Sequence, residues 1–281
     1  WLRELPALVE REAAFLRDRG ADLVLVDAPA AACAAAAAAG VPAVLCSNFL
    51  WSDVYGDRFG AEVLAVLRAA YGAARLGLRL GIGRLPLDGV SRVREIGGVL
   101  GRAPTRARAA VRAELGLGEE VTVIGLGLGR SHGPAQTAAL LAGLGGATGG
   151  DLRVLVPEDN LPAGTDARVV AFPAGARDAQ DYLAASDLVL AKGGYSTIAE
   201  AALAGVPLCL FPVTDNAESA ALCRDAEALG LGFAYPDEAH LRAALADPSL
   251  VLGRARALPP RPPVSPAAPQ ILAALRDEGL L

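Results

Sequence analysis

Residues 187–207, DLVLAKGGYSTIAEAALAGVP, join a short apolar run, a polar turn and a helix-like run in direct succession. Asp187 to Ala191 has the length and apolar content of a buried strand, and Thr197 to Ala204 has the apolar spacing and alanine content of a helix. The turn between them, residues 192–196, contains two glycines, a tyrosine, a serine and the single lysine of the chain. The stretch therefore predicts a strand-to-helix turn that concentrates polar groups.

Strand-like and helix-like runs alternate along the rest of the chain. Two strand-like runs lie in the first 50 residues, and six more lie between residues 121 and 235, mostly with helical runs between them. Alternation at this spacing favours parallel, doubly wound sheets. Residues 86–105 are rich in Gly, Pro and Arg, which suits a connector. We predict an α/β protein with a first domain at residues 1–85 and a second at residues 106–281.

Composition argues against a nucleic-acid partner. The chain has 281 residues, of which 53% are hydrophobic, and a formal net charge of -5. A chain of this size buries roughly 75% of its unfolded surface, so a substantial core is expected. A net negative chain lacks the basic footprint of an electrostatic nucleic-acid binder.

Two features bear on the compartment. The uncharged stretch 28–46 is mostly alanine and is interrupted by Pro29, Gly40 and Pro42, which disfavours a transmembrane span and leaves peripheral membrane contact open. The sequence does not open like a secretion leader. The cysteines lie singly in apolar surroundings, without the spacing of a zinc or redox motif: Cys33, Cys46, Cys209 and Cys223. We expect a cytoplasmic protein with reduced thiols and no metal site.

A second glycine-rich turn, GLGLGRSHG at residues 125–133, directly follows the strand-like run 121–124. Glycines at a strand end let backbone N–H groups approach a phosphate. The turn is not the six-residue dinucleotide fingerprint, because the acidic residue expected about twenty positions later has no candidate at a strand end. A purely structural turn explains the same glycines equally well.

The turn at 192–200 combines several groups that suit a diphosphate. Gly193 and Gly194 remove side-chain bulk, and the following helix N-terminus adds the positive end of a dipole. Ser196 and Thr197 can cap that helix or donate to a phosphate. Glu200 can share their face and accept hydrogen bonds from two neighbouring sugar hydroxyls. The alternative is a capping box of Thr197 with Glu200, which needs no ligand.

Lys192 is an exception in a chain that otherwise uses arginine. Of 26 basic residues it is the single lysine. A compact ammonium on a flexible stem suits a strand end that faces a phosphate, where a planar guanidinium does not fit as readily. We interpret Lys192 as a functional residue, although chance placement of one lysine remains the alternative.

Residues 187–232 resemble the donor-binding region of GT-B glycosyltransferases. The shared pattern is an aspartate-led strand, Lys, a glycine pair, Tyr, a small polar residue, Glu and then Ala-Gly-Val-Pro. The broad likeness is to the peptidoglycan N-acetylglucosaminyltransferase type and the glucuronosyltransferases. A closer likeness is to predicted bacterial glycosyltransferases and to the glycosyltransferase-like domain of L-arabinokinases. Residues 26–55, with their Ser-Asn-Phe-x-Trp segment, and residues 101–129 are similar to further parts of the same group.

The resemblance implies two Rossmann-like domains, with a nucleotide sugar bound mainly by the second and an acceptor by the first. It implies no cofactor, because the UDP-linked donor is a substrate, and no metal, because a helix N-terminus and basic side chains stabilise the departing diphosphate. The implied donor-binding residues are Gly127, Gly129, Gly193, Gly194, Ser196, Thr197, Glu200, Asp215, Asn216 and Glu218. Lys192 and Arg130 would stabilise the departing diphosphate, and His132 is a candidate for acid-base catalysis.

Three functional hypotheses follow. The first is a glycosyltransferase, the second is a non-catalytic nucleotide-sugar binding domain, and the third is a nucleotide-sugar 2-epimerase on the same architecture. Family members begin with a strand and a Gly- and His-containing loop, which has no counterpart here, and Trp1 to Leu5 already resembles part of a helix. We therefore expect the first domain to be truncated. In it, Asp27, Asn48, Trp51 and Asp53 are candidates for the acceptor side, with core packing as the alternative for Trp51.

Overall fold

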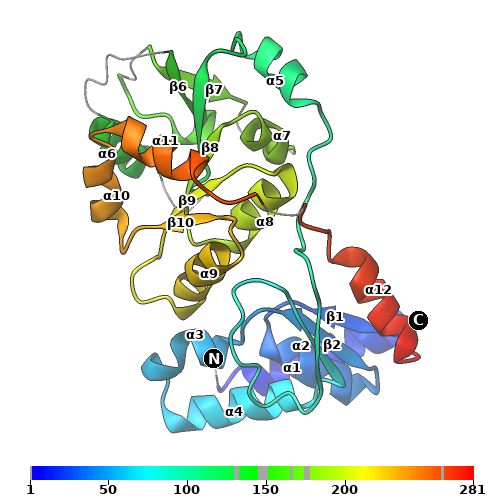
Figure 1. The fold of residues 1–281 in the computed structure, drawn as a ribbon. Coiled ribbons are helices and arrows are strands. Elements are labelled where there is room, and N and C mark those ends of the chain that lie inside the picture. Colours follow the sequence, from blue (N-terminus) through cyan, green and yellow to red (C-terminus); the bar gives the residue numbers. More distant parts are fainter. Residues whose placement is uncertain (1, 130–132, 145–150, 165–166, 174–177, 261–262) are drawn as a thin grey trace. The chain divides into compact units, whose positions relative to one another are not determined.

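We determined a computed structural model that describes residues 2–129, 133–144, 151–164, 167–173, 178–260 and 263–281 (Figure 1). The chain divides into two compact units. The first unit comprises Trp1–Gly98, Asn216–Ala221 and Ala267–Leu281, and the second comprises Val99–Asp215 and Leu222–Pro266. Each unit contains a parallel sheet, so the predicted α/β class with two parallel-sheet domains is confirmed, and the described strands of the second unit have the doubly wound order.

The first unit contains a four-stranded sheet in the order β1-β2-β3-β4. Its strands are β1 (Val24–Val26), β2 (Ala43–Ser47), β3 (Leu76–Arg79) and β4 (Val93–Glu95). Its helices are α1 (Leu5–Asp18), α2 (Ala30–Ala39), α3 (Trp51–Tyr55), the 3₁₀ turn η1 (Gly56–Arg58), α4 (Ala61–Gly72) and α12 (Ala268–Asp277). The alanine-rich α2 buries Ala30, Cys33 and Ala36 in the core, because small side chains permit close packing.

Tyr71 of α4 joins the two strand-end loops of the first unit. Its side chain is fully buried, and its hydroxyl donates a hydrogen bond to the carbonyl oxygen of Ala28, at 2.7 Å. The same hydroxyl accepts a hydrogen bond from the backbone N–H of Trp51, at 3.1 Å. Ala28 follows β1 and Trp51 follows β2, so this one side chain fixes the loops at the carboxyl ends of two neighbouring strands.

The second unit contains a six-stranded sheet in the order β10-β9-β8-β5-β6-β7. Its strands are β5 (Thr122–Leu126), β6 (Leu152–Pro157), β7 (Val169–Phe172), β8 (Leu188–Lys192), β9 (Leu208–Phe211) and β10 (Gly232–Ala234). Its helices are α5 (Arg108–Glu114), α6 (Pro134–Gly143), η2 (Glu158–Asn160), α7 (Ala179–Ala184), α8 (Tyr195–Ala204), α10 (Glu238–Ala244) and α11 (Pro248–Arg256). Helix α9 (Ala217–Ala228) begins in the first unit and ends in the second.

The order of this sheet contains a topological switch point. From β5 the chain adds β6 and β7 on one side, and then returns to add β8, β9 and β10 on the other side. The connections that leave the carboxyl ends of β5 and β8 therefore run in opposite directions. In open α/β sheets, ligands bind in the crevice at this place.

The units divide the chain differently from the boundaries that composition suggested. Within the expected connector 86–105, β4 pairs with β3, and residues from Val99 onward belong to the second unit. The C-terminal α12 groups with the first unit, where Gln270 accepts a hydrogen bond from the N–H of Gly97 at 2.8 Å and Asp277 pairs with Arg94 at 2.8 Å. Helix α4 ends at Gly72, and β3 follows it. None of the described helices combines the length and apolar character needed to cross a bilayer.

Candidate functional site

The two glycine-rich turns predicted from the sequence meet at the switch point. After β5, the N–H of Gly127 donates to the carbonyl oxygen of Leu190 in β8, at 2.8 Å. A Cβ atom at Gly127 would lie 2.4 Å from Cγ2 of Thr197 and 3.2 Å from Cγ1 of Val189. Only a glycine permits this approach, so the loop after β5 lies directly against the first turn of α8.

Helix α8 begins at Tyr195, two residues earlier than the sequence pattern indicated. Gly194 is the N-cap residue, and the first hydrogen bond to it comes from the N–H of Ile198, at 3.2 Å. The N–H groups of Ser196 and Thr197 belong to the first turn, whose amides a helix cannot satisfy internally. A Thr197–Glu200 capping box would require Thr197 to be the N-cap residue. Because Gly194 is the N-cap and no side chain caps the helix, that alternative is wrong. Gly193 is engaged within the sheet, because its N–H donates to Phe211 at 2.8 Å.

Lys192 ends β8 and lies between the two turns. A Cβ atom at Gly129 or at Gly194 would be 3.9 Å from Cε of Lys192, so the lysine stem passes close to both glycines. Gly129 has a φ of 70°, a conformation that favours glycine over other residues. Partial burial lowers the pKa of Lys192. The site thus combines a partly desolvated cation with a helix N-terminus.

Glu200 lies one turn further along α8 and is 8% exposed. Its Oε1 atom accepts two hydrogen bonds from Arg102, from Nε at 3.0 Å and from Nη2 at 2.9 Å. The sequence did not reveal this arginine, because it lies in the segment interpreted as a connector. The structure therefore brings together Gly127, Gly129, Lys192 and the first turn of α8, and adds Arg102 beside Glu200.

The three residues predicted to face the sugar fall in two different units. Asp215 is exposed and has a φ of 54°, while Asn216 accepts a hydrogen bond from the N–H of Ser219, at 2.8 Å, and so caps α9. Glu218 accepts a hydrogen bond from Asn48, at 3.4 Å, and burial raises its pKa, with a further contribution from the charge of Asp27. By their contacts Asn216 and Glu218 group with the first unit, whereas Lys192 and Glu200 belong to the second. Arg130 and His132 lie outside the described residues.

The first unit places polar groups after β1 and β2. Asn48 is buried and donates to the carbonyl oxygen of Gly83, at 3.2 Å. Asp27 is exposed by area, yet crowding by neighbouring atoms desolvates it enough to raise its pKa. Asp53 has a structural contact, because its Oδ2 accepts a hydrogen bond from the N–H of Leu50, at 2.9 Å, at the start of α3. Within the described ranges, His, Cys, Asp and Glu side chains form no group of three that could hold a metal ion.

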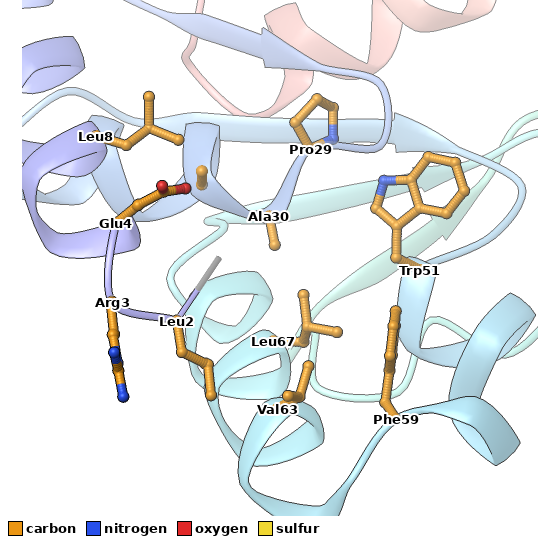
Figure 2. A pocket seen from close by; sticks show the side chains of 11 residues that line it. Leu2, Arg3, Glu4, Leu8, Pro29, Ala30, Trp51, Phe59, Val63 and Leu67 are labelled. Carbon is orange, nitrogen blue, oxygen red and sulfur yellow. The ribbon is translucent and has the colours of Figure 1, made fainter.

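An apolar pocket of about 800 Å³ opens in the first unit beside Trp51 (Figure 2). Its lining comes from the N-terminal residues and from α1 to α4: Leu2, Arg3, Glu4, Leu8, Pro29, Ala30, Ala31, Trp51, Phe59, Val63 and Leu67. Trp51 is 36% exposed and stacks on Tyr55 at a centroid distance of 5.5 Å, whereas Phe49 is buried. Core packing therefore accounts for Phe49, and Trp51 presents an aromatic wall to the pocket.

Asp53 gives a test of the first unit's electrostatics. Burial, together with the charge of Asp88, raises the pKa of Asp53 from 3.8 to about 6, against the opposing effects of the Leu50 N–H and Arg68. A carboxyl group with a raised pKa in the folded state contributes stability at low pH, which is lost as the pH rises through about 6. The free energy of unfolding should therefore fall by about 1 kcal/mol between pH 4.5 and 7.5 relative to Asp53→Asn, allowing for partial solvent screening.

Urea unfolding of the wild type and of Asp53→Asn across this pH range measures the difference. Asparagine keeps an oxygen that can accept from Leu50, so the variant isolates the charge. Parallel pH curves for the two proteins would show that the Asp53 carboxylate is solvated as well in the folded chain as in the unfolded one.

The chain is similar to known proteins in sequence and in fold. Residues 164–226 match the glycosyltransferase family 28 C-terminal domain. L-arabinokinase from Arabidopsis thaliana is 30% identical in an alignment of 218 residues that covers 71% of this chain and 19% of the relative. The chain thus spans about a fifth of that protein's length.

Among solved structures, spinosyn rhamnosyltransferase SpnG in complex with spinosyn aglycone superposes with a TM-score of 0.61 at 19% identity, covering 90% of this chain and 73% of that chain. A protein from Listeria monocytogenes assigned as a UDP-N-acetylglucosamine 2-epimerase gives a TM-score of 0.66 at 15% identity, covering 98% and 79%. At these identities the likeness establishes the fold alone.

The two parallel units and these superpositions define a protein with the fold of the GT-B glycosyltransferases. More particularly, residues 164–226, which include β8, α8 and β9, match the glycosyltransferase family 28 C-terminal domain. The resemblance that the sequence suggested is thereby confirmed.

Proposed function

We propose that this protein is a glycosyltransferase that binds a nucleoside-diphosphate sugar, UDP-linked by preference, at the switch point of its second unit. One observation carries the proposal: Gly127, Lys192 and the first turn of α8 converge at the carboxyl ends of β5 and β8. A phosphate at this place would meet backbone N–H groups, the positive end of a helix and an ammonium. The family match over 164–226 supports the same assignment.

The transfer we propose breaks the bond between the anomeric carbon of the sugar and the terminal phosphate oxygen. The diphosphate departs with the bonding electron pair, and the acceptor hydroxyl forms the new bond to the anomeric carbon and loses its proton to a base. Lys192 and the α8 amides would stabilise the charge that develops on the departing diphosphate. Glu200 would hold the ribose through its hydroxyls.

The proposed acceptor side is the apolar pocket of the first unit. Trp51 and Phe59 give it two aromatic side chains, and aliphatic residues form most of the rest. Such a lining favours an acceptor with an aromatic or aliphatic body that carries the hydroxyl to be glycosylated. The four cysteines are buried free thiols, which fits the cytoplasmic location that we propose.

Binding and turnover with a panel of nucleotide sugars test the proposal. Calorimetry should detect binding of at least one nucleoside diphosphate, and the corresponding sugar donor should be transferred or slowly hydrolysed, with release of the diphosphate. Binding without any turnover would favour the non-catalytic hypothesis. Absence of binding by every nucleotide in the panel would remove the proposal.

Glu200→Gln should weaken UDP binding by roughly 10-fold or more, because a hydrogen bond to a charged group contributes about 1.5–3 kcal/mol. The matched control is Glu114→Gln, which also alters a glutamate paired with an arginine, Arg106, but on the exposed face of α5. UDP affinity in the control should equal that of the wild type. Equal affinity in Glu200→Gln would exclude Glu200 from the site.

A further inference from the structure

Arg102 lies in a short segment, residues 99–105, that is fastened to the helices of the second unit at several points. The N–H of Leu100 donates to the hydroxyl of Tyr195 in α8, at 3.0 Å. A Cβ atom at Gly101 would lie 2.9 Å from Cβ of Ala199, so glycine lets the segment touch the helix. The segment therefore approaches α8 on the residues that flank the predicted phosphate and ribose contacts.

The other end of the 99–105 segment is held by α7. Asp181 is buried, and its two carboxylate oxygens accept from Thr105, Oδ1 from the backbone N–H at 2.6 Å and Oδ2 from the hydroxyl at 2.9 Å. The backbone is therefore anchored both before and after Arg102, in each case to a helix of the second unit. The backbone position of Arg102 does not depend on the ion pair that its side chain forms.

The ion pair between Arg102 and Glu200 is asymmetric in two respects. The arginine side chain is 54% exposed, whereas the glutamate side chain is only 10% exposed. Both donated hydrogen bonds reach the same oxygen, Oε1, and in the described part of the chain no group donates to Oε2. A largely buried carboxylate without a partner is strongly destabilising, and Arg102 supplies the partner of Glu200.

Resting on the function proposed above, we infer that Arg102 is a positioning residue that holds Glu200 ready for the ribose. By engaging Oε1 it fixes the carboxylate in one orientation and keeps Oε2 available to accept from a ribose hydroxyl. Without the guanidinium, the glutamate side chain regains rotamer freedom that ribose binding must then remove. The alternative is that Arg102 competes with the ribose for the Glu200 carboxylate. In that case the ion pair must break before the ribose binds.

The sign of the change in affinity separates these two effects. Calorimetry compares the wild type, Arg102→Ala and Arg102→Lys with two probes, UDP and 2′,3′-dideoxyuridine diphosphate, which lacks both ribose hydroxyls. We expect Arg102→Ala to weaken UDP binding by roughly 10-fold and the dideoxy probe by less than about 2-fold. Arg102→Lys should fall between, since it keeps the charge and loses the paired geometry.

Arg106→Ala is the matched control, because Arg106 also pairs with a glutamate, Glu114, but on the surface of the same unit. Its UDP affinity should not change. Tighter UDP binding by Arg102→Ala, or an equal loss for both probes, would overturn the inference while leaving the proposed function intact. Failure of the wild type to bind either probe would instead overturn the proposed function, and the inference with it.

Discussion

Replacement of Lys192 by methionine is expected to weaken UDP binding by roughly 10- to 100-fold. Methionine keeps an unbranched stem that can pass between Gly129 and Gly194, and it removes only the ammonium. If the same ammonium stabilises the departing diphosphate, the rate of sugar transfer at saturating donor should also fall, by about 100-fold. Calorimetry with UDP and a diphosphate-release assay measure the two effects.

Uridine, which has no phosphate, makes this experiment specific. The affinity for uridine should be the same in the wild type and in Lys192→Met, because the lysine is proposed to contact phosphate alone. An equal loss for uridine and UDP would indicate that Lys192 supports the shape of the turn and has no role in charge recognition. Arg106→Met, which removes an exposed cation of the same unit, is the control for net charge.

Lys192→Arg should recover little of the lost affinity. A Cβ atom added at Gly129 or at Gly194 would lie 3.9 Å from Cε of Lys192, so the space around the stem is narrow. The planar guanidinium is wider than an ammonium. This chain uses arginine at every other basic position, so the single lysine at a crowded strand end is the exception that composition revealed. Affinity at the wild-type level in Lys192→Arg would show that charge alone suffices there.

The fold was predictable because the signal lies in local patterns. Each buried strand of the second unit is a short apolar run, such as Leu188 to Ala191, and most are followed by a helix-like run. The pattern missed two strands of the first unit, β3 and β4. Of these, β4 (Val93–Glu95) is an exposed, partly charged edge strand. With only three residues and no apolar run, it has the composition of a connector and was interpreted as one.

The candidate site was only partly predictable, because its residues meet through tertiary structure. Parallel strands explain why the turns after β5 and β8 lie on one edge, but the sequence does not say that these two strands are neighbours. The pairing of Arg102 with Glu200 joins positions 98 residues apart, and no periodic pattern links them. The start of α8 was placed two residues late because the apolar spacing and alanine content of a helix begin only at Thr197, whereas Gly194 is the N-cap residue.

Gly127→Ala is expected to lower both the stability of the second unit and its affinity for UDP. The added Cβ would lie 2.4 Å from Cγ2 of Thr197, so the loop after β5 and the first turn of α8 must move apart. Overpacking of this kind costs about 1–3 kcal/mol of folding free energy, and displacement of the loop should lower UDP affinity by at least about 10-fold. Urea unfolding and calorimetry measure both losses.

The double variant Gly127→Ala with Thr197→Ser tests the cause directly. Serine keeps the hydroxyl of Thr197 and removes the methyl group that the new Cβ would strike, so most of the stability and of the UDP affinity should return. The return should be incomplete, because Cγ1 of Val189 would still lie 3.2 Å from the added atom. Gly253→Ala is the control, since its Cβ would meet nothing within 4 Å and alanine favours a helix interior such as α11. If the double variant is no better than Gly127→Ala alone, the contact between the two turns does not hold the site together, and the convergence on which the proposed donor site rests is lost.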